Sequence, residues 1–383
     1  MAQKEPTGAP FIFGIRVRGD NFTDRKEETN RLRENFLHGV NTILISPRRM
    51  GKTSLVEKVC STIDNQGVKI AHMDAFGCRS EADFVNAFAT AVIKATSTRL
   101  EEWIANARTF LGRIVPKVSF GQDPLNEFSV TLDFDNTTVK TEEVLKMPEL
   151  IASTRGYRIV ICIDEFQQIG EFADSLTFQK KLRSVWQLQT NVSYCLYGSK
   201  KHIMETIFQN RSHPFYRFGD IIYLGKISED DWVEYICRRF EVTGKAISAD
   251  LARQICRTTE CYSSYVQQLA WFVWLRADGN ATADDLRHGI DMLIDTCEPL
   301  FILQTEKLSE YQMNFLHAIA DGVHTGFSRS EVMKRYRFGT APNIVRLKKT
   351  LIAADLITST APRMLSMSDP ILSLWLKMRV WGR

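Results

Sequence analysis

The sequence predicts an α/β fold in which a parallel sheet forms the core and two smaller parts follow it. The strand-like run of residues 42–45 leads through a polar loop into a helical pattern of apolar residues. A second run, 159–163, is fully apolar, as expected of a central parallel strand. After Gly225 such runs stop and helical spacing takes over. We therefore expect a sheet-containing core in residues 1–225 and mainly helical parts beyond it.

The composition is that of an ordinary globular protein. The chain has 383 residues, which suggests two or three domains, with 44% apolar and 25% charged residues. Its start is polar and lacks the apolar core of a signal peptide, and its hydrophobic stretches are too short to span a bilayer. We therefore expect a cytoplasmic protein without a membrane partner. Eight cysteines occur without a C-x-x-C pair, which favours buried reduced thiols over disulfides or a metal site.

A phosphate-loop motif lies between the first strand and the helix that follows it. The pattern G-x-x-x-x-G-K-[ST] fits from Ser46 to Thr53 at every position except the first, where serine replaces glycine. Backbone N–H groups of such a loop, together with a helix N-terminus, attract anions. We expect Lys52 to reach the β- and γ-phosphates and the Thr53 hydroxyl to bind Mg²⁺. The expected nucleotide contacts are Pro47, Arg48, Arg49, Met50, Gly51, Lys52, Thr53 and Ser54.

The segment ahead of this motif, 22–28, leads into a helical pattern. In nucleotide-binding chains such a segment often packs over the adenine, which would make Phe22 and Arg25 adenine-side residues. A capped helix with a solvated run of charges explains the same pattern equally well.

After the phosphate-loop motif and its helix, the sequence predicts a second strand at 68–73. Ser80 and Asp83 predict a capping box that opens a helix. In the segment 110–145, the alternation of residues 130–134 fits either a hairpin insertion or a long loop. We assign no role to that segment.

The strand predicted at 158–163 ends in two adjacent carboxylates, Asp164 and Glu165. Ligands of open α/β sheets bind at this carboxyl edge. In a Walker B motif of this kind the first carboxylate holds Mg²⁺ and the second orients and polarises the attacking water. We expect these roles for Asp164 and Glu165. A solvated turn is the alternative.

Two further strands are predicted, at 192–197 and 220–224. Ser199 follows the first of them and is our candidate for a polar sensor near the γ-phosphate, although a Gly-Ser-Lys sequence also makes an ordinary loop. Arg217 precedes the second strand, where an arginine that enters a site can supply charge to the transition state. A surface position for Arg217 fits the sequence equally well.

Beyond the core, three helices are predicted between Ser228 and Leu275, which indicates a small helical bundle. Trp271, Phe272 and Trp274 are interpreted as core residues of this bundle rather than as an aromatic binding stripe.

The last part predicts three helices and a two-stranded hairpin, the order of a winged helix. Capping boxes are predicted at 309–312 and 328–331, a third helix begins near Thr340, and the hairpin spans about residues 356–367. On the third helix Ile344, Leu347 and Leu351 share one face. The opposite face is polar and would contact duplex DNA, through Asn343, Arg346, Lys349 and Thr350.

The charge of this last part supports contact with a polyanion. From Glu306 to Arg383 it carries 12 Lys and Arg residues against 6 Asp and Glu, whereas the whole chain has a net charge of only +4. A solvated helix face is a serious alternative. Trp375, Met378 and Trp381 would also be able to dock this part on the core and cover the recognition helix.

Several segments, taken in order, resemble an archaeal-type predicted ATPase family of the AAA+/STAND branch of P-loop NTPases. They read SPRRMGKTSL, ICIDEFQQI, YGSKKHIMETIF, HPFYRFGDIIYL and SDPILSLWLKM, and the resemblance covers essentially the whole chain. It implies a five-stranded parallel core in 1–225, a helical lid in 226–304 and a winged helix in 305–383. It also implies ATP or ADP with Mg²⁺ as ligands.

The resemblance has two departures. Phe22 and Arg25 match the adenine-side box of the family, but Asp24 and Lys26 depart from its commonest form. Where such families often show Gly-His-Pro in the lid, this chain has Tyr-Ser-Ser at 262–264.

AAA+ relatives often place an arginine ahead of the fifth strand to complete a neighbour's site, which would give Arg217 a role in a homo-oligomer.

Three functions follow from these observations. The first is a slow Mg²⁺-dependent ATPase that acts as a nucleotide-controlled switch coupled to the winged helix. The second is a nucleotide-regulated DNA-binding protein. The third is a scaffold whose winged helix packs on a protein partner or on its own core.

Overall fold

The structure is a computed structural model that describes residues 9–15, 17, 22–63, 67–97, 102, 118–122, 128–132, 141–361 and 364–382. The chain divides into two compact units. One unit is the continuous segment Arg25–Gly225, and the other combines Met1–Asp24 with Lys226–Arg383. The division at Gly225 coincides with the point where the strand-like runs stop. The segment before Arg25, which we expected in the core, groups with the C-terminal half instead.

The core unit contains a five-stranded sheet in the order β2-β5-β6-β1-β7, and every pair of neighbours is parallel. This confirms the predicted fold class. In β5 every residue between the two ends is buried, as a central strand covered on both faces requires. The strands are β1 (Thr42–Ile45), β2 (Val68–Asp74), β5 (Arg158–Asp164), β6 (Val192–Gly198) and β7 (Asp220–Tyr223).

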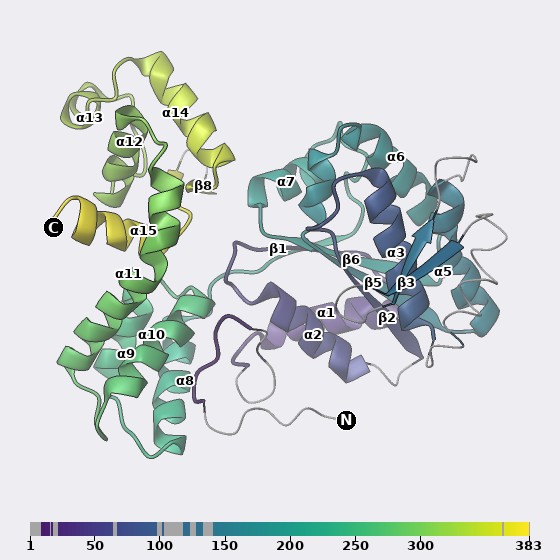
Figure 1. The fold of residues 1–383 in the computed structure, drawn as a ribbon, viewed down its shortest axis with the longest axis horizontal. Coiled ribbons are helices and arrows are strands. Elements are labelled where there is room, and N and C mark those ends of the chain that lie inside the picture. The colour runs from purple at the N-terminus through teal and green to yellow at the C-terminus, as the bar shows by residue number, and fades with distance from the viewer. Residues whose placement is uncertain are drawn as a thin grey trace. The chain divides into compact units, whose positions relative to one another are not determined.

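Helices cover both faces of this sheet (Figure 1). One face packs into a large apolar cluster with α3, α5, α6, α7 and the 3₁₀ turn η2, in which Phe166, Trp186 and Phe215 are buried. The helices α1 and α2 contribute nothing to that cluster and contact each other instead. The bounds are α1 (Lys26–His38), α2 (Lys52–Ile63), α3 (Glu81–Ala95), α5 (Thr141–Arg155), η2 (Phe166–Glu171), α6 (Ser175–Trp186) and α7 (Lys201–Gln209).

An antiparallel pair of strands lies between α3 and α5 in the sequence. It joins β3 (Val118–Gln122) and β4 (Phe128–Leu132). This settles the choice between hairpin and loop in favour of the hairpin. The rest of 110–140 lies outside the described residues.

The second unit begins with a helical bundle of α8 (Glu229–Val242), α9 (Ala249–Thr258), α10 (Ser263–Arg276) and α11 (Ala283–Thr305). The N-terminal segment packs on it. Phe11 is buried, with its ring 6.3 Å from that of Tyr235 and 5.7 Å from that of Phe240, and Arg239 donates to the Pro10 carbonyl at 2.6 Å. These contacts explain why the segment belongs to this unit.

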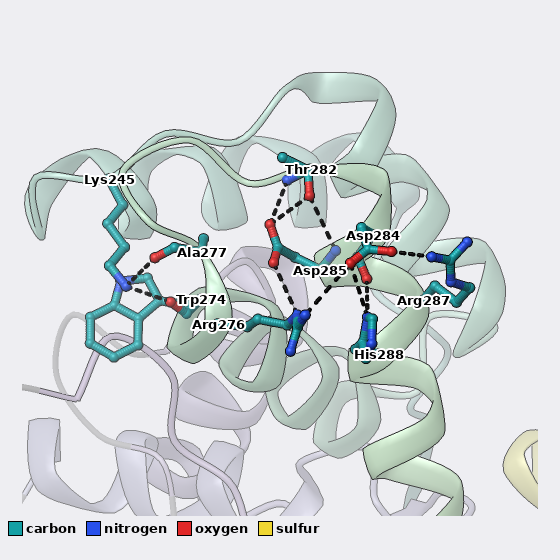
Figure 2. A network of polar contacts seen from close by, with 9 residues as sticks. All are labelled: Lys245, Trp274, Arg276, Ala277, Thr282, Asp284, Asp285, Arg287 and His288. Carbon is teal, nitrogen blue, oxygen red and sulfur yellow. Dashed lines mark hydrogen bonds and ion pairs between the residues drawn. The ribbon is translucent and has the colours of Figure 1, made fainter.

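The aromatic residues of α10 are not the core of the bundle, and that prediction was wrong. Trp271, Phe272 and Trp274 are only half-buried, and α10 is apolar on most sides. Figure 2 shows Lys245 lying over the Trp274 ring while it donates to the carbonyls of Trp274 and Ala277 at the end of α10. The buried residues of α10 are Tyr265, Val266, Gln267, Leu269, Ala270 and Val273.

The long helix α11 was not foreseen in the sequence. It starts with a complete capping box in which Thr282 and Asp285 bond each other's backbone N–H groups (Figure 2). Arg276, at the end of α10, adds ion pairs to Asp284 at 3.5 Å and Asp285 at 3.3 Å. The start of α11 is therefore fixed to the end of α10.

The C-terminal part contains three helices and an antiparallel strand pair in the predicted order. They are α12 (Glu310–Ala320), α13 (Ser330–Tyr336), α14 (Ala341–Ala353), β8 (Ile357–Ala361) and β9 (Met364–Met367). Ser309 and Gln312 form the predicted capping box. The box predicted at 328–331 is wrong, because Arg329 still donates to the Gly326 carbonyl in a turn and α13 starts without a side-chain cap.

The chain then continues through α15 (Pro370–Trp375) into the π-helical turn η3 (Leu376–Val380). Trp375 donates from Nε1 to Glu298 of α11 at 2.8 Å, and Trp381 stacks on His317 of α12 with ring centroids 4.0 Å apart. These aromatic residues therefore dock on the bundle and on α12 and leave the polar face of α14 uncovered by them. No helix among the described residues is long and apolar enough to cross a membrane.

Candidate nucleotide-binding site

Two residues of the loop between β1 and α2 have an unusual backbone conformation. Arg49 and Gly51 both have left-handed backbone conformations, with φ of 66° and 84°. A Cβ at Gly51 would meet no atom within 4 Å, so conformation rather than space favours glycine there. Ser46, the departure from the motif, is buried, and its hydroxyl donates to the Pro47 carbonyl at 3.0 Å. Serine is therefore accommodated at the first position.

The loop meets the carboxylates that end β5. Thr53 Oγ1 donates to Asp164 Oδ2 at 2.9 Å. Lys52 Nζ lies 2.8 Å from Glu165 Oε1 and 3.7 Å from Asp164 Oδ1. These charged side chains are 12 to 19% exposed, so they interact largely shielded from water. The structure thus brings together the two segments that carry the Walker A and Walker B patterns.

Two donors hold the other oxygen of Glu165. Ser199, at the end of β6, donates to Oε2 at 2.9 Å, which places the candidate sensor at the site. Gln167 donates from Nε2 to the same oxygen. Sequence analysis did not single out Gln167, because nothing in the spacing E-x-Q shows that the turn after β5 folds the amide back onto the carboxylate.

The two carboxylates differ in proton affinity although they are neighbours. Burial raises the pKa of Asp164 above its usual value, and the positive charge of Lys52 and the Thr53 hydroxyl only partly oppose this. Burial also acts to raise the pKa of Glu165, but the charge of Lys52 and the hydrogen bonds from Lys52, Gln167 and Ser199 outweigh it, so that this pKa is lowered. Of the two carboxylates, Glu165 is therefore the one whose ionised form the site favours.

Arg25 is buried, with 4% exposure, and faces backbone carbonyls. It donates from Nη2 to Gly225 at 2.7 Å and to Met50 of the phosphate loop at 3.3 Å, and it pairs through Nη1 with Glu28 at 3.1 Å. Arg25 therefore supports the loop from behind. Phe22, its predicted companion, belongs to the other unit.

Arg217 is not brought to this site within the chain. It is exposed, and its guanidinium lies 5.4 Å from the centre of the Tyr216 ring. It precedes Asp220, which is in register with Thr42 at the start of β1, whereas the phosphate loop follows the end of β1. Parallel register therefore puts Arg217 at the opposite edge of the sheet.

The donor set fits Mg²⁺ with a phosphate ligand. Thr53 and Asp164 present a hydroxyl and a carboxylate side by side, and oxygen is the ligand that Mg²⁺ prefers. Within the described ranges no group of three or more His, Cys, Asp or Glu residues forms a metal site, so a cation here would take its remaining ligands from phosphate and water. Such partial protein ligation is usual for Mg²⁺.

The predicted DNA face of α14 belongs to the other unit. Arg346, Lys349 and Thr350 are exposed, and the opposite face is buried through Ile344, Leu347 and Leu351. Asn343 is half-buried instead, because its amide donates to the Phe338 carbonyl at 2.8 Å.

Sheet order, phosphate loop and terminal carboxylates together define the P-loop NTPase fold of the AAA+ type, and the chain has this fold. A solved structure of a Walker-type ATPase of Pyrococcus abyssi superposes with a TM-score of 0.69 at 16% identity, covering 96% of this chain and 99% of that one. The ORC2 protein of Aeropyrum pernix, solved with ADPNP and ADP, gives 0.57 at 12% identity and 97% of each chain. The ORC1 protein of the same organism, solved with DNA, gives 0.50 at 12% identity and 94% of each chain. No family model and no curated protein matches the sequence.

Proposed function

We propose that this protein binds ATP and hydrolyses it slowly with Mg²⁺, using the nucleotide state as a switch. The observation that carries the proposal is the convergence of Lys52, Thr53, Asp164 and Glu165 at the carboxyl edge of the sheet. The nucleotide complexes of the ORC2 protein, which has a similar fold, are consistent with it.

Each of these residues has a task that its chemistry suits. Lys52 would leave Glu165 for the β- and γ-phosphates, where a fixed cation balances the negative charge. Thr53 and Asp164 would hold Mg²⁺, which neutralises developing charge on the phosphates. Glu165 would accept a proton from the attacking water, and Ser199 would keep the Glu165 carboxylate in place. The loop residues 47–54 would surround the phosphates, and Arg25, which donates to the Met50 carbonyl, would support the loop.

A turnover assay tests this proposal. Phosphate release is measured over time with Mg²⁺·ATP, with and without duplex DNA, and across protein concentrations. Wild-type protein should release phosphate, and Glu165→Gln protein should bind ATP with little release. An ATP affinity that is unchanged in Lys52→Ala would show that the loop does not bind nucleotide.

A second proposal is that α14 contacts DNA in a winged-helix arrangement. Its support is the exposed face of Arg346, Lys349 and Thr350, in a part of the chain rich in positive charge. A similar fold has been solved with DNA in the ORC1 protein. DNA affinity that falls with salt would favour this role, and its absence at low salt would favour a scaffold that binds a protein partner.

A third proposal concerns assembly. Since Arg217 lies at the edge of the sheet away from the chain's own site, it would act on a neighbouring copy in a homo-oligomer. Arg217→Ala protein mixed with Lys52→Ala protein tests this. Both variants should be inactive alone and recover turnover together, because mixed neighbours rebuild some complete sites. A mixture that stays inactive removes the support for action in trans.

A further inference from the structure

Gln167 is a buried polar residue that the steps described so far do not require. It lies in η2, two residues after Glu165, and its exposure is 3%. Its Nε2 donates to Glu165 Oε2, while its Oε1 is buried without a hydrogen-bond partner among the described residues. An unpaired buried carbonyl costs free energy, and this cost offsets part of what the hydrogen bond to Glu165 contributes to stability.

The orientation of this amide is fixed by its surroundings. Turning it over would place a carbonyl oxygen against the Glu165 carboxylate, where two acceptors repel each other. The unpaired Oε1 therefore has to face the end of β6. The amide therefore keeps its hydrogen bond to Glu165 while its Oε1 stays without a partner among the described residues.

Gly198, at the end of β6, provides the space. A Cβ at this position would overlap Gln167 Oε1 and would lie 3.0 Å from Met204 Sδ, so the end of the Gln167 side chain would have to move. The backbone of Gly198 is not left-handed, so any residue could adopt it. Gly198 therefore leaves the space that the Gln167 amide fills, and a larger residue there would have to displace that amide.

Glu165 has an unusual backbone conformation and a carboxylate held on both sides. Its φ of 49° is left-handed, a conformation that residues other than glycine adopt rarely. Its two oxygens have separate partners, Lys52 on Oε1 and Gln167 with Ser199 on Oε2. If Lys52 turns to a phosphate, the contacts of Gln167 and Ser199 with Glu165 Oε2 would remain. Glu165 Oε1 would then be free to accept a hydrogen bond while the carboxylate keeps its position.

We propose that Gln167 is a positioning residue that holds the Glu165 carboxylate for hydrolysis, in a space that only glycine at 198 leaves open. The proposal rests on the proposed function, since it assigns Glu165 its role there. Gln167 acts through Glu165 alone, and nucleotide binding does not depend on it.

The variant Gln167→Met tests the proposal. Methionine keeps the length of the side chain. It loses the hydrogen bond to Glu165 but also removes the unpaired buried acceptor, and because these two changes act on stability in opposite directions, Tm should change little. The expected result is a kcat lower by roughly ten- to a hundredfold, the effect of losing one hydrogen bond to a charged group, with Mg²⁺·ATP affinity within about twofold of wild type. The matched control is Gln168→Met, one residue on in the same turn, where the amide instead contacts Glu171 at 3.3 Å.

Gly198→Ala provides a second arm. The added methyl group should displace the Gln167 amide and reproduce the loss in kcat, and the double variant Gly198→Ala/Gln167→Met should be no slower than Gln167→Met. A merely structural role would instead give additive losses that follow thermal stability. Unchanged kcat in Gln167→Met, or additive losses, overturns the proposal.

A crystal structure of nucleotide-free Gln167→Met separates this inference from the proposed function. If wild-type protein releases no phosphate, hydrolysis is refuted, but the position of Glu165 is still measured. The Glu165 carboxylate should leave Ser199 or occupy more than one conformation in the variant. A carboxylate that keeps its single orientation refutes positioning by Gln167.

Discussion

Replacing Lys52 by alanine should affect both ATP affinity and the stability of the nucleotide-free protein. In the structure Lys52 is the cation that Glu165 and Asp164 share, at 2.8 and 3.7 Å, and all three side chains are mostly buried. Its removal leaves two adjacent carboxylates without a counter-charge. The variant should therefore be destabilised at neutral pH, besides losing most of its ATP affinity.

The magnitude follows from the contacts. A hydrogen bond to a charged group contributes about 1.5–3 kcal/mol, and residual exposure places this pair toward the lower part of that range. In a unit of this size 1 kcal/mol lowers Tm by about 2–4 °C, so the expected loss is about 3–8 °C. The double variant Lys52→Ala/Glu165→Gln should regain part of this loss, because one of the two carboxylates is then neutral.

Calorimetry provides both readouts, with scanning runs for Tm and ATP titrations for affinity. Lys58→Ala is the control, since Lys58 lies on the same helix beyond the loop. The reasoning is refuted if Lys52→Ala binds ATP as wild type does. It is also refuted if neutralising Glu165 leaves the Tm of the Lys52→Ala protein unchanged.

Three further predictions follow from other contacts. Glu165→Gln should bind ATP normally and turn over about 10²–10⁴ times more slowly, because the amide keeps the shape and cannot take a proton; a parallel loss of affinity in the ATP titration would contradict this. Arg346→Ala/Lys349→Ala should weaken binding of a fluorescent duplex and lower the salt slope by about one unit for each lost phosphate contact, and an unchanged slope would remove α14 from the interface. Asp220→Asn should lower the free energy of unfolding by about 1 kcal/mol at neutral pH. Burial acts to raise the pKa of Asp220, but the hydrogen bonds from Arg31 and Asn35 outweigh it, so this pKa is lowered. The stabilisation by Asp220 is therefore present above the ordinary pKa of an aspartate and disappears as the pH falls through the lowered value. Equal urea midpoints for wild type and Asp220→Asn at pH 7 would contradict that assignment.

Local patterns were enough to predict the sheet and its two motifs. Each strand is a short apolar run, and the phosphate loop and the carboxylates after β5 are contiguous in sequence, so no tertiary information was needed. The sequence did not decide between a hairpin and a long loop for β3 and β4, because the alternation of polar and apolar residues there is weak.

Residues whose role depends on packing were harder to predict. Gln167 reaches Glu165 only because η2 turns back toward the end of β6, and no spacing rule encodes that turn. Trp271 and Trp274 are as apolar as any core residue, but α10 has more apolar surface than its neighbours cover. The edge on which Arg217 lies required the strand order and register.

The contact of Arg25 with Gly225 has a topological consequence. These two residues are the first and last of the core unit. Because the Arg25 side chain reaches the Gly225 carbonyl, the points where the chain enters and leaves this unit lie no further apart than the length of that side chain. The second unit is made of the segments on either side. The core is thus an insertion with neighbouring ends, an arrangement in which a domain can be excised or transplanted with little disturbance to its host. Residues 25–225 expressed alone should keep the sheet, and a short linker should close the remaining chain.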